Sequence, residues 1–282
     1  MLKLARSFFE ERGYLEADPC ALMRGAPLDS HVEPMPVAVT PTETAYLHTS
    51  PEFALKRLLA AGCGNVYFLG HVFRQGEVGA RHNPEFCMAE WYRIHADYRD
   101  FIAETAAFLA LFLGPLPLQF LAYRDAFAQY ATGDIASIGG NPNWSPAEQL
   151  DFRLTTQVEP HLGRNCITAL TDFPPEQAAL ARIHNGTAER FELYVNGLEL
   201  ANGYHELAQS AEQHRRFTAE NSARVARGKA PLPLDDAFIA ALDRLPDCCG
   251  VSVGFDRLLM LQQREKHISR VLPFSWSLPE EC

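Results

Sequence analysis

Residues 65–92 read as a β-hairpin, and this segment constrains the chain more than any other stretch of the sequence. An apolar strand over residues 65–74 leads into a polar loop that ends at Pro84, and an alternating strand then returns. One face of the returning strand carries Phe86, Met88, Glu90 and Tyr92. An aromatic ring suits an adenine base, Glu90 suits an ammonium group, and the guanidinium of Arg74 suits phosphate oxygens. The hairpin therefore predicts a site for ATP beside an amine-bearing substrate.

Length and composition indicate one large domain. The chain has 282 residues, of which 47% are hydrophobic, and can bury a sizeable core, so we expect a single domain over residues 1–282. The seven cysteines are odd in number and include no C-x-x-C pair, which argues against a disulfide framework and a zinc site and favours a reducing cytoplasm. The sequence shows no signal-peptide pattern and no apolar run of membrane-spanning length, so neither secretion nor membrane insertion is expected.

The charge balance argues against nucleic acid as a partner. The formal net charge is −10 at pH 7, whereas phosphate contacts need clustered Lys and Arg. We therefore do not expect tRNA to bind. The most basic stretch, residues 215–229, has helical spacing and is expected to be a solvated face.

Helices are predicted near the start and in the middle of the chain. Residues 1–12 have helical spacing and stop at Gly13, a residue that suits the left-handed position after a helix. A longer helix is predicted for residues 98–113. Residues 114–146 are interrupted by Gly, Pro and Asn, and are expected to be an irregular insertion.

A further helix is predicted to begin at Ser50 and Pro51, a hydroxyl cap followed by proline at the first helical position, and to end at Gly62. Glu52 then lies near the helix start. Its carboxylate either contacts a substrate or only complements the helix dipole.

The turn Asn196-Gly197 predicts a second hairpin. A two-residue turn pairs Tyr194 with Glu199 and Glu192 with Ala201, which places Glu192 and Glu199 together on the polar face. Neighbouring carboxylates repel unless a cation lies between them, and their hard oxygens suit Mg²⁺ bound to ATP. The alternative is an acidic hairpin face in contact with solvent.

Beyond this turn, unbroken alternation would place Asn202, Tyr204 and Glu206 on the apolar face. We therefore expect the strand to bulge or end near Gly203, since only then can these side chains reach a substrate. Without an irregularity they would be polar partners within the core.

Residues 250–254 predict a buried strand whose glycines allow close backbone approach, and residues 255–260 predict the helix that follows. Arg257 lies in the first turn of that helix. A cation is unfavourable at this end of the helix dipole, which favours a phosphate partner over a structural role for Arg257.

Residues 73–92 resemble motif 2 of class II aminoacyl-tRNA synthetases, and residues 250–258 resemble their motif 3. Over residues 1–277 the chain is similar to the elongation factor P–(R)-β-lysine ligase family, a paralogue of the lysyl-tRNA synthetase catalytic domain. The resemblance implies the α+β class II synthetase catalytic fold, an antiparallel sheet flanked by helices, without an anticodon-binding domain. It also implies a homodimer formed through residues 1–19. The stretches that carry it are residues 49–52, 56–59, 61–64, 82–86, 90–93, 199–207 and 246–260.

The resemblance implies a reaction in two steps. The carboxylate of (R)-β-lysine or lysine attacks the α-phosphate of ATP to give an adenylate, and a lysine side chain of elongation factor P then accepts the aminoacyl group. By resemblance, Arg74 would hold the α-phosphate and Arg257 the γ-phosphate, and Glu192 and Glu199 would bind Mg²⁺. Further implied ATP contacts are Glu77, His82, Asn83 and Phe86, and implied substrate contacts are Ser50, Glu52, Glu90, Tyr92, Asn202, Tyr204, Glu206, Ser252 and Gly254.

The sequence departs from the family pattern in two places. Motif 2 commonly reads Arg-Asn-Glu, whereas this chain has Arg74-Gln75-Gly76-Glu77, so the glutamate is displaced by one residue. Inside motif 3, lysyl-tRNA synthetases have glycine and the ligase family usually has alanine where this chain has Ser252. A side chain at this position would narrow the space for the α-amino group of ordinary lysine.

Two other functions compete with this interpretation. A truncated lysyl-tRNA synthetase is opposed by the acidic charge balance. A non-catalytic synthetase-like sensor or scaffold would be expected to lose phosphate or metal ligands, whereas Arg74, Arg257, Glu192 and Glu199 are all retained.

Overall fold

The computed structural model describes residues 1–25, 28 and 32–276, which divide into two compact units. The first unit contains residues 1–96 together with the described part of the chain from residue 207 onward, and the second contains residues 97–206. A single domain over residues 1–282 stays a prediction.

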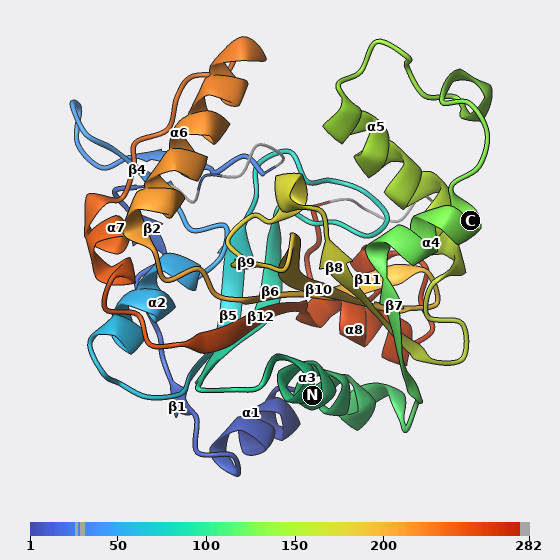
Figure 1. Ribbon diagram of the computed structural model, residues 1–282. Helices are drawn as coiled ribbons and strands as arrows, with labels where there is room; N and C mark the ends of the chain where they lie inside the picture. Colours follow the sequence, from blue (N-terminus) through green and yellow to red (C-terminus); the bar gives the residue numbers. More distant parts are fainter. Residues whose placement is uncertain (26–27, 29–31, 277–282) are drawn as a thin grey trace. The chain divides into compact units, whose positions relative to one another are not determined.

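The first unit contains a sheet in which the predicted hairpin is central. The strands β1 (Leu15–Glu16), β5 (Val66–Phe73), β6 (Glu85–Ile94) and β12 (Cys248–Gly254) lie in that order (Figure 1). β1 and β5 are parallel, and the other two pairs are antiparallel. A smaller sheet has the order β2 (Leu22–Met23), β4 (Thr44–Leu47) and β3 (Pro36–Ala38). The hairpin predicted for residues 65–92 is thus confirmed.

Helices of the first unit bring distant parts of the sequence together. They are α1 (Leu2–Glu10), α2 (Glu52–Ala60), α6 (Ser210–Ala226), α7 (Asp236–Leu242), α8 (Phe255–Gln262) and the short turn η5 (Ile268–Arg270). α2 and α7 lie side by side because Phe53 stacks on Phe238, with ring centroids 3.9 Å apart (Figure 1). Phe9 of α1 stacks on Tyr67 of β5 at 4.3 Å.

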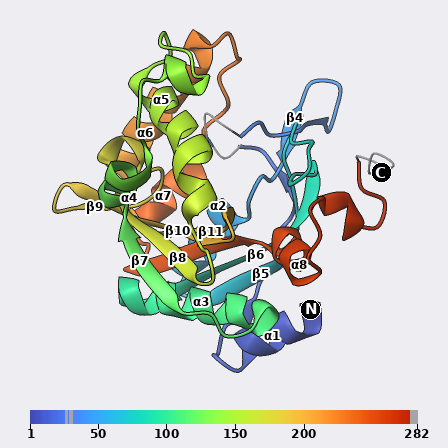
Figure 2. The ribbon, with the colours of Figure 1, turned by 90° about the vertical axis from the view of Figure 1, so that its right-hand side faces the viewer.

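α8 lies beside the ends of β5 and β6 (Figure 2). Its position is fixed by Asp256, whose Oδ2 accepts a hydrogen bond from the Cys87 backbone N–H in β6 at 2.7 Å. Arg257 therefore enters the first turn of α8, as predicted, next to the hairpin.

The basic stretch at residues 215–229 is not simply a solvated face, so that prediction was wrong in part. Arg224 of α6 is 1% exposed, and its guanidinium donates to both carboxylate oxygens of Glu33 at 3.1 and 2.8 Å. Helical spacing alone cannot reveal a partner 191 residues away in the sequence.

The second unit contains a four-stranded arrangement with an added short strand. The strands β11 (Leu198–His205), β10 (Thr187–Val195), β8 (Ile167–Phe173) and β7 (Leu118–Ala122) lie in that order, and β9 (Ile183–His184) pairs with β10. β7 and β8 are parallel, whereas the other pairs are antiparallel. The helices and helical turns are α3 (Tyr98–Leu113), α4 (Tyr123–Tyr130), η1 (Ala136–Ile138), α5 (Pro146–Arg153), η2 (Leu154–Val158), η3 (Glu159–His161) and η4 (Pro175–Gln177). The α+β class is confirmed, and α3 has its predicted bounds.

Residues 114–146 are not the irregular insertion that was predicted, because β7 and α4 lie within them. In this segment the Gly, Pro and Asn residues lie outside β7 and α4, so they do not indicate that regular structure is absent. Tyr123 and Phe127 stack on one face of α4 at 4.4 Å, and Tyr123 packs on Phe173 of β8 at 5.0 Å. Such short elements depend on tertiary packing more than on local propensity.

The described cysteines, at positions 20, 63, 87, 166, 248 and 249, are not joined in disulfides, and Cys282 lies outside the described residues. Within residues 1–25, 28 and 32–276, none of the helices combines the length and the hydropathy needed to cross a membrane.

Candidate active site

Arg74 directly follows β5, and its guanidinium lies over the ring of Phe86 in β6, 5.1 Å from the ring centroid. Its Nε donates to the Thr49 carbonyl at 3.4 Å, and its Nη1 lies 3.6 Å from Oε1 of Glu77. The hairpin thus holds a fixed cation beside an aromatic face, and such a combination can contact both the phosphates and the base of a nucleotide.

Arg257 reaches the loop of the same hairpin from α8. Its Nη2 lies 2.6 Å from Nε2 of His82, and its Nε donates to the Arg81 carbonyl at 3.3 Å. Burial, followed by the charge of Arg257, lowers the pKa of His82, and the charge of Arg74 acts in the same direction. A neutral His82 can accept the hydrogen bond from Arg257. The loop therefore gathers cationic groups, an arrangement that suits the oxygens of a polyphosphate.

Asn83 and Gly254 shape this region. The Nδ2 of Asn83 donates to the Glu85 carbonyl at 2.6 Å, and its Oδ1 accepts from the Trp276 N–H at 2.9 Å, so its amide holds the backbone on both sides. Gly254 caps α8, and a Cβ built at this position would touch the side chain of Arg257 at 3.5 to 3.7 Å. The side chain of Arg257 thus packs next to Gly254, at ordinary van der Waals distance from where a Cβ would lie.

Glu90 is a buried carboxylate on β6, with 2% of its surface exposed. Its Oε2 accepts from the Ser50 hydroxyl and its Oε1 from the Tyr92 hydroxyl, both at 2.7 Å. Burial, followed by the negative charge of Glu52, raises the pKa of Glu90 to about 8. A carboxylate in this environment is stabilised by a cationic partner, which a substrate ammonium can supply.

Ser50 links Glu90 to the start of α2. Its Oγ accepts from the Glu52 N–H at 3.0 Å while it donates to Glu90. Lys56, 1% exposed, forms an ion pair with Glu52 one turn further along α2. No role was predicted for Lys56, although its i, i+4 spacing from Glu52 was a usable signal. Glu52 therefore pairs with a lysine of its own helix and also lies at the N-terminal end of α2, where the helix dipole favours negative charge.

Ser252 of β12 lies directly opposite Glu90 of β6 in the register. Side chains of directly opposed residues in an antiparallel pair lie on the same face. Gly250 faces Tyr92 and Gly254 faces Met88, so glycines flank Ser252 on this face. Ser252 is consequently the side chain that β12 adds next to the Glu90 carboxylate.

The second predicted hairpin is formed by β10 and β11, with a register that departs from the prediction after two pairs. Tyr194 faces Glu199 as predicted, but Glu192 faces Asn202 and not Ala201. The prediction was wrong because it extended the register of the turn along an unbroken ladder.

A β-bulge at Leu200 causes this difference by adding one residue to β11 between the two pairs. The bulge reverses the alternation beyond it, so Asn202 and Tyr204 lie opposite Glu192 and Arg190 and share their face. The expected irregularity is therefore confirmed, slightly before the glycine at which it was predicted.

Glu192 is held by an arginine and a tyrosine that were not predicted as site residues. Arg190 Nη2 donates to its Oε1, and the Tyr194 hydroxyl donates to its Oε2. Burial lowers the pKa of Arg190, but the nearby acids, Glu192 first, outweigh burial and raise it. Burial raises the pKa of Tyr194, and the charges of Glu192 and Glu199 raise it further. Arg190 and Tyr194 each lie two residues from Glu192 along the strand, and this spacing could have predicted that they share its face.

The two glutamates of this hairpin fit a divalent cation that is shared with a nucleotide. Both glutamates raise the pKa of Tyr194, which lies opposite Glu199 and two residues from Glu192, so both carboxylates are on the same face of the hairpin. Among the described residues, no cluster of three or more His, Cys, Asp or Glu side chains could hold a metal by itself. Mg²⁺ in nucleotide sites typically takes one or two carboxylates and completes its shell with phosphate oxygens and water, which matches Glu192 and Glu199.

The predicted site residues fall into two sets, and a single site built from both sets stays a prediction. Within the first unit, contacts connect Ser50, Glu52, Glu90 and Tyr92, and a second group connects Arg74, Glu77, His82 and Arg257. Within the second unit, Glu206 follows β11, forms a bridge with Ala181 and is buried. The first-unit residues are Ser50, Glu52, Arg74, Glu77, His82, Asn83, Phe86, Glu90, Tyr92, Ser252, Gly254 and Arg257, and the second-unit residues are Glu192, Glu199, Asn202, Tyr204 and Glu206.

Comparison with known proteins gives the chain its relatives. Residues 1–277 match the family described as tRNA synthetases class II (D, K and N). A Salmonella dublin protein named elongation factor P–(R)-β-lysine ligase is 39% identical over 295 residues, covering 96% of this chain and 91% of that protein. Proteins of the same name from Salmonella paratyphi B and Salmonella heidelberg show the same identity and coverage.

Proposed function

Since the chain belongs to the class II tRNA synthetase family, we propose that it is an ATP-dependent aminoacyl ligase that activates (R)-β-lysine or lysine and transfers it to elongation factor P. The family supports the ligase class, and the name of the Salmonella relatives supports the acceptor protein. The cysteine content fits a reducing cytoplasm, which is the proposed compartment.

The observation that carries the substrate class is the buried carboxylate of Glu90. It accepts from Ser50 and Tyr92, lies opposite Ser252, and has a pKa that burial and Glu52 raise to about 8. An ammonium group stabilises the ionised form of such a carboxylate, whereas a neutral side chain would leave Glu90 protonated and an acidic one would be repelled by the ionised form. A lysine isomer supplies ammonium groups and also the carboxylate that must be activated.

In the first step, a carboxylate oxygen of the amino acid attacks the α-phosphorus of ATP, the bond to the β-phosphate oxygen breaks, and pyrophosphate leaves. Arg74 would hold the α-phosphate over the Phe86 ring, and Arg257, steadied by His82, would hold the γ-phosphate. These guanidinium groups stabilise negative charge without transferring a proton. Glu192 and Glu199 would hold Mg²⁺, which supplies neutralisation of the phosphate charge when it is bound.

In the second step, the ε-amine of a lysine in elongation factor P attacks the adenylate carbonyl, an amide bond forms, and AMP leaves. No side-chain nucleophile of this chain is needed, so catalysis would rest on positioning and on charge stabilisation. Accordingly, the residues proposed to act on the phosphates are the arginines Arg74 and Arg257 and the metal-binding carboxylates Glu192 and Glu199, and none of them is a nucleophile paired with a base.

The test is ATP–pyrophosphate exchange with (R)-β-lysine and with lysine, followed by mass spectrometry of elongation factor P after incubation. Exchange with at least one isomer, and one added aminoacyl group on elongation factor P, are expected. A protein that binds a lysine isomer but catalyses no exchange would be a sensor. Exchange followed by aminoacylation of tRNA, and not of elongation factor P, would identify a truncated lysyl-tRNA synthetase.

A further inference from the structure

Glu33 is a heavily bonded carboxylate in residues 32–35, a segment outside helices and strands that precedes β3. Its oxygens accept hydrogen bonds from Nη1 and Nη2 of Arg224 at 3.1 and 2.8 Å and from Nζ of Lys229 at 2.9 Å. The bond from Arg224, more than any other interaction, lowers the pKa of Glu33. Glu33 is therefore ionised and fixed in place at neutral pH.

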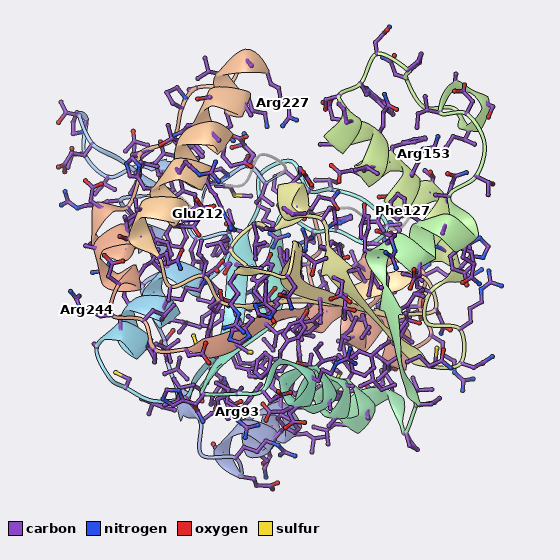
Figure 3. All side chains as sticks on the ribbon, in the orientation of Figure 1. Arg93, Phe127, Arg153, Glu212, Arg227 and Arg244 are labelled. Carbon is purple, nitrogen blue, oxygen red and sulfur yellow. The ribbon has the colours of Figure 1, made fainter. Side chains whose placement is uncertain are left out.

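The C-terminal end of α6 supplies the cations that bind the Glu33 carboxylate. Arg224 is 1% exposed, and a buried guanidinium is stable only when its hydrogen bonds are satisfied. Its Nε donates to the Ala230 carbonyl at 3.4 Å, and its own carbonyl accepts from the Lys229 N–H at 3.0 Å. Both cations lie at or beyond the last turn of α6, the end marked by Arg227 in Figure 3, where the helix dipole favours positive charge.

The backbone of Glu33 reaches the residue next to Arg74. The Glu33 carbonyl accepts from the Gln75 N–H at 2.8 Å. At this point the chain has left β5, which ends at Phe73, and it turns at Gly76, whose φ is +79°. Arg74 is tied to the far side of the loop through its own N–H, which donates to the Pro84 carbonyl at 2.8 Å. Glu33 thus supplies one of the supports from outside the hairpin, beside the Thr49 carbonyl, which accepts from Arg74 Nε, and the His48 carbonyl, which accepts from the Phe73 N–H at 3.0 Å.

We propose that Glu33, Arg224 and Lys229 are positioning residues for Arg74, and that the C-terminal end of α6 thereby sets the affinity for ATP. This inference rests on the proposed function, in which Arg74 is a phosphate contact. The support acts on the phosphate side of the hairpin because Gln75 adjoins Arg74. Glu90, by contrast, lies in the middle of β6 and is held by Ser50 and Tyr92. Loss of the support should therefore weaken ATP binding and leave amino-acid binding nearly unchanged.

The experiment compares Arg224→Met and Glu33→Gln with Arg216→Met. Arg216 is a matched control because it lies on the same helix and bonds to Glu212 within α6, at 2.9 Å and near the opposite end of the helix (Figure 3). The dissociation constant for ATP with Mg²⁺ is measured by calorimetry, and the KM values for ATP and the amino acid are measured by pyrophosphate exchange. We expect both ATP constants to rise about tenfold in the first two variants, since small displacements of a positioned group have effects of this size. The amino-acid KM should change by less than about twofold, and the control should match the wild type.

Rescue and coupling separate positioning from folding. Arg224→Lys should bind ATP more tightly than Arg224→Met. The double variant Glu33→Gln with Arg224→Met should bind ATP as tightly as the single variant with the lower ATP affinity, because the two residues act through one contact. If Arg224→Met does not fold, Glu33→Gln and Arg224→Lys still test the idea. Unchanged ATP affinity in folded Glu33→Gln, or equal losses for both substrates, would overturn the proposal. Calorimetry with ATP needs no turnover, so an absence of exchange activity would count against the proposed function alone.

Discussion

At the scale of single residues, the raised pKa of Glu90 makes amino-acid binding depend on pH. Below about pH 8 the Glu90 carboxylate of the free protein carries a proton, whereas an ammonium group binds the ionised form. Binding must then release that proton, so the amino-acid KM should rise as pH falls from 8 to 6.5, approaching tenfold per unit well below the pKa. The KM for ATP, measured in parallel, should not follow this curve.

The raised pKa of Glu90 also affects stability, and here the effect is the opposite of that on binding: stability falls as pH rises, whereas amino-acid binding improves. The folded pKa of Glu90 lies above the ordinary value of 4.5, so the folded state binds this proton more tightly than the unfolded state. The contribution of Glu90 to stability is therefore lost as pH rises from about 4.5 toward 8, and bound lysine should offset that loss.

Glu90→Gln removes the titration and should abolish the pH dependence of the residual amino-acid binding. A flat amino-acid KM in the wild type between pH 6.5 and 8 would show that Glu90 does not bind the ammonium.

Ser252 is expected to discriminate between lysine isomers, since it lies opposite Glu90 between two glycines. Ser252→Gly should raise activity toward α-lysine relative to (R)-β-lysine, because it restores space beside the carboxylate. Changes of this kind in a pocket wall are worth about 1–3 kcal/mol, so a shift in the ratio is expected and not a conversion. Pyrophosphate exchange with both isomers on both proteins measures it. An unchanged ratio would move the search for selectivity to Tyr204 and Ala201.

At the scale of elements, the bulged hairpin of β10 and β11 is expected to carry the metal. Glu192→Gln or Glu199→Gln should each reduce adenylate formation by at least about tenfold, since each removes a charge that would hold Mg²⁺ on the phosphates. Glu189→Gln is the matched control, because Glu189 is on the same strand but pairs with Arg182 and His205. Raising the Mg²⁺ concentration should restore part of the activity of Glu199→Gln. Wild-type turnover in both hairpin variants would favour the alternative of an acidic face without a metal.

The elements that could be predicted from sequence are those whose signals are local. The two hairpins, α3 and the strand–helix step at Arg257 follow from alternation, turn residues and helix ends. The failures all depend on partners distant in the sequence or on packing. Tyr123 of α4 packs on Phe173 of β8, and the buried guanidinium of Arg224 is bonded to Glu33. The bulge at Leu200 was expected only because substrate-binding side chains needed it, and its position could not be read from residue types.

At the scale of the whole molecule, a homodimer through residues 1–19 stays a prediction. In the first unit, β1 lies at the end of the strand order, and its Leu15 is 55% exposed. Leu2 and Leu4 of α1 are 47% and 46% exposed. Apolar side chains that gather near an open strand are typical of surfaces that pair with a second copy, and twofold dimers are the commonest oligomers. We therefore expect a dimer mass in sedimentation or light scattering at micromolar concentration.

Charged substitutions distinguish this surface from exposed apolar residues in general. Leu4→Glu combined with Leu15→Glu should shift the protein toward monomer, because like charges buried in an interface without a partner are costly. Val225→Glu is the control, since Val225 is 54% exposed on α6, which lies at the opposite side of the first unit from α1 (Figure 1). This control should remain a dimer. A monomer mass for the wild type at micromolar concentration would contradict the prediction, and a dimer that survives both leucine changes would place the interface elsewhere on the chain.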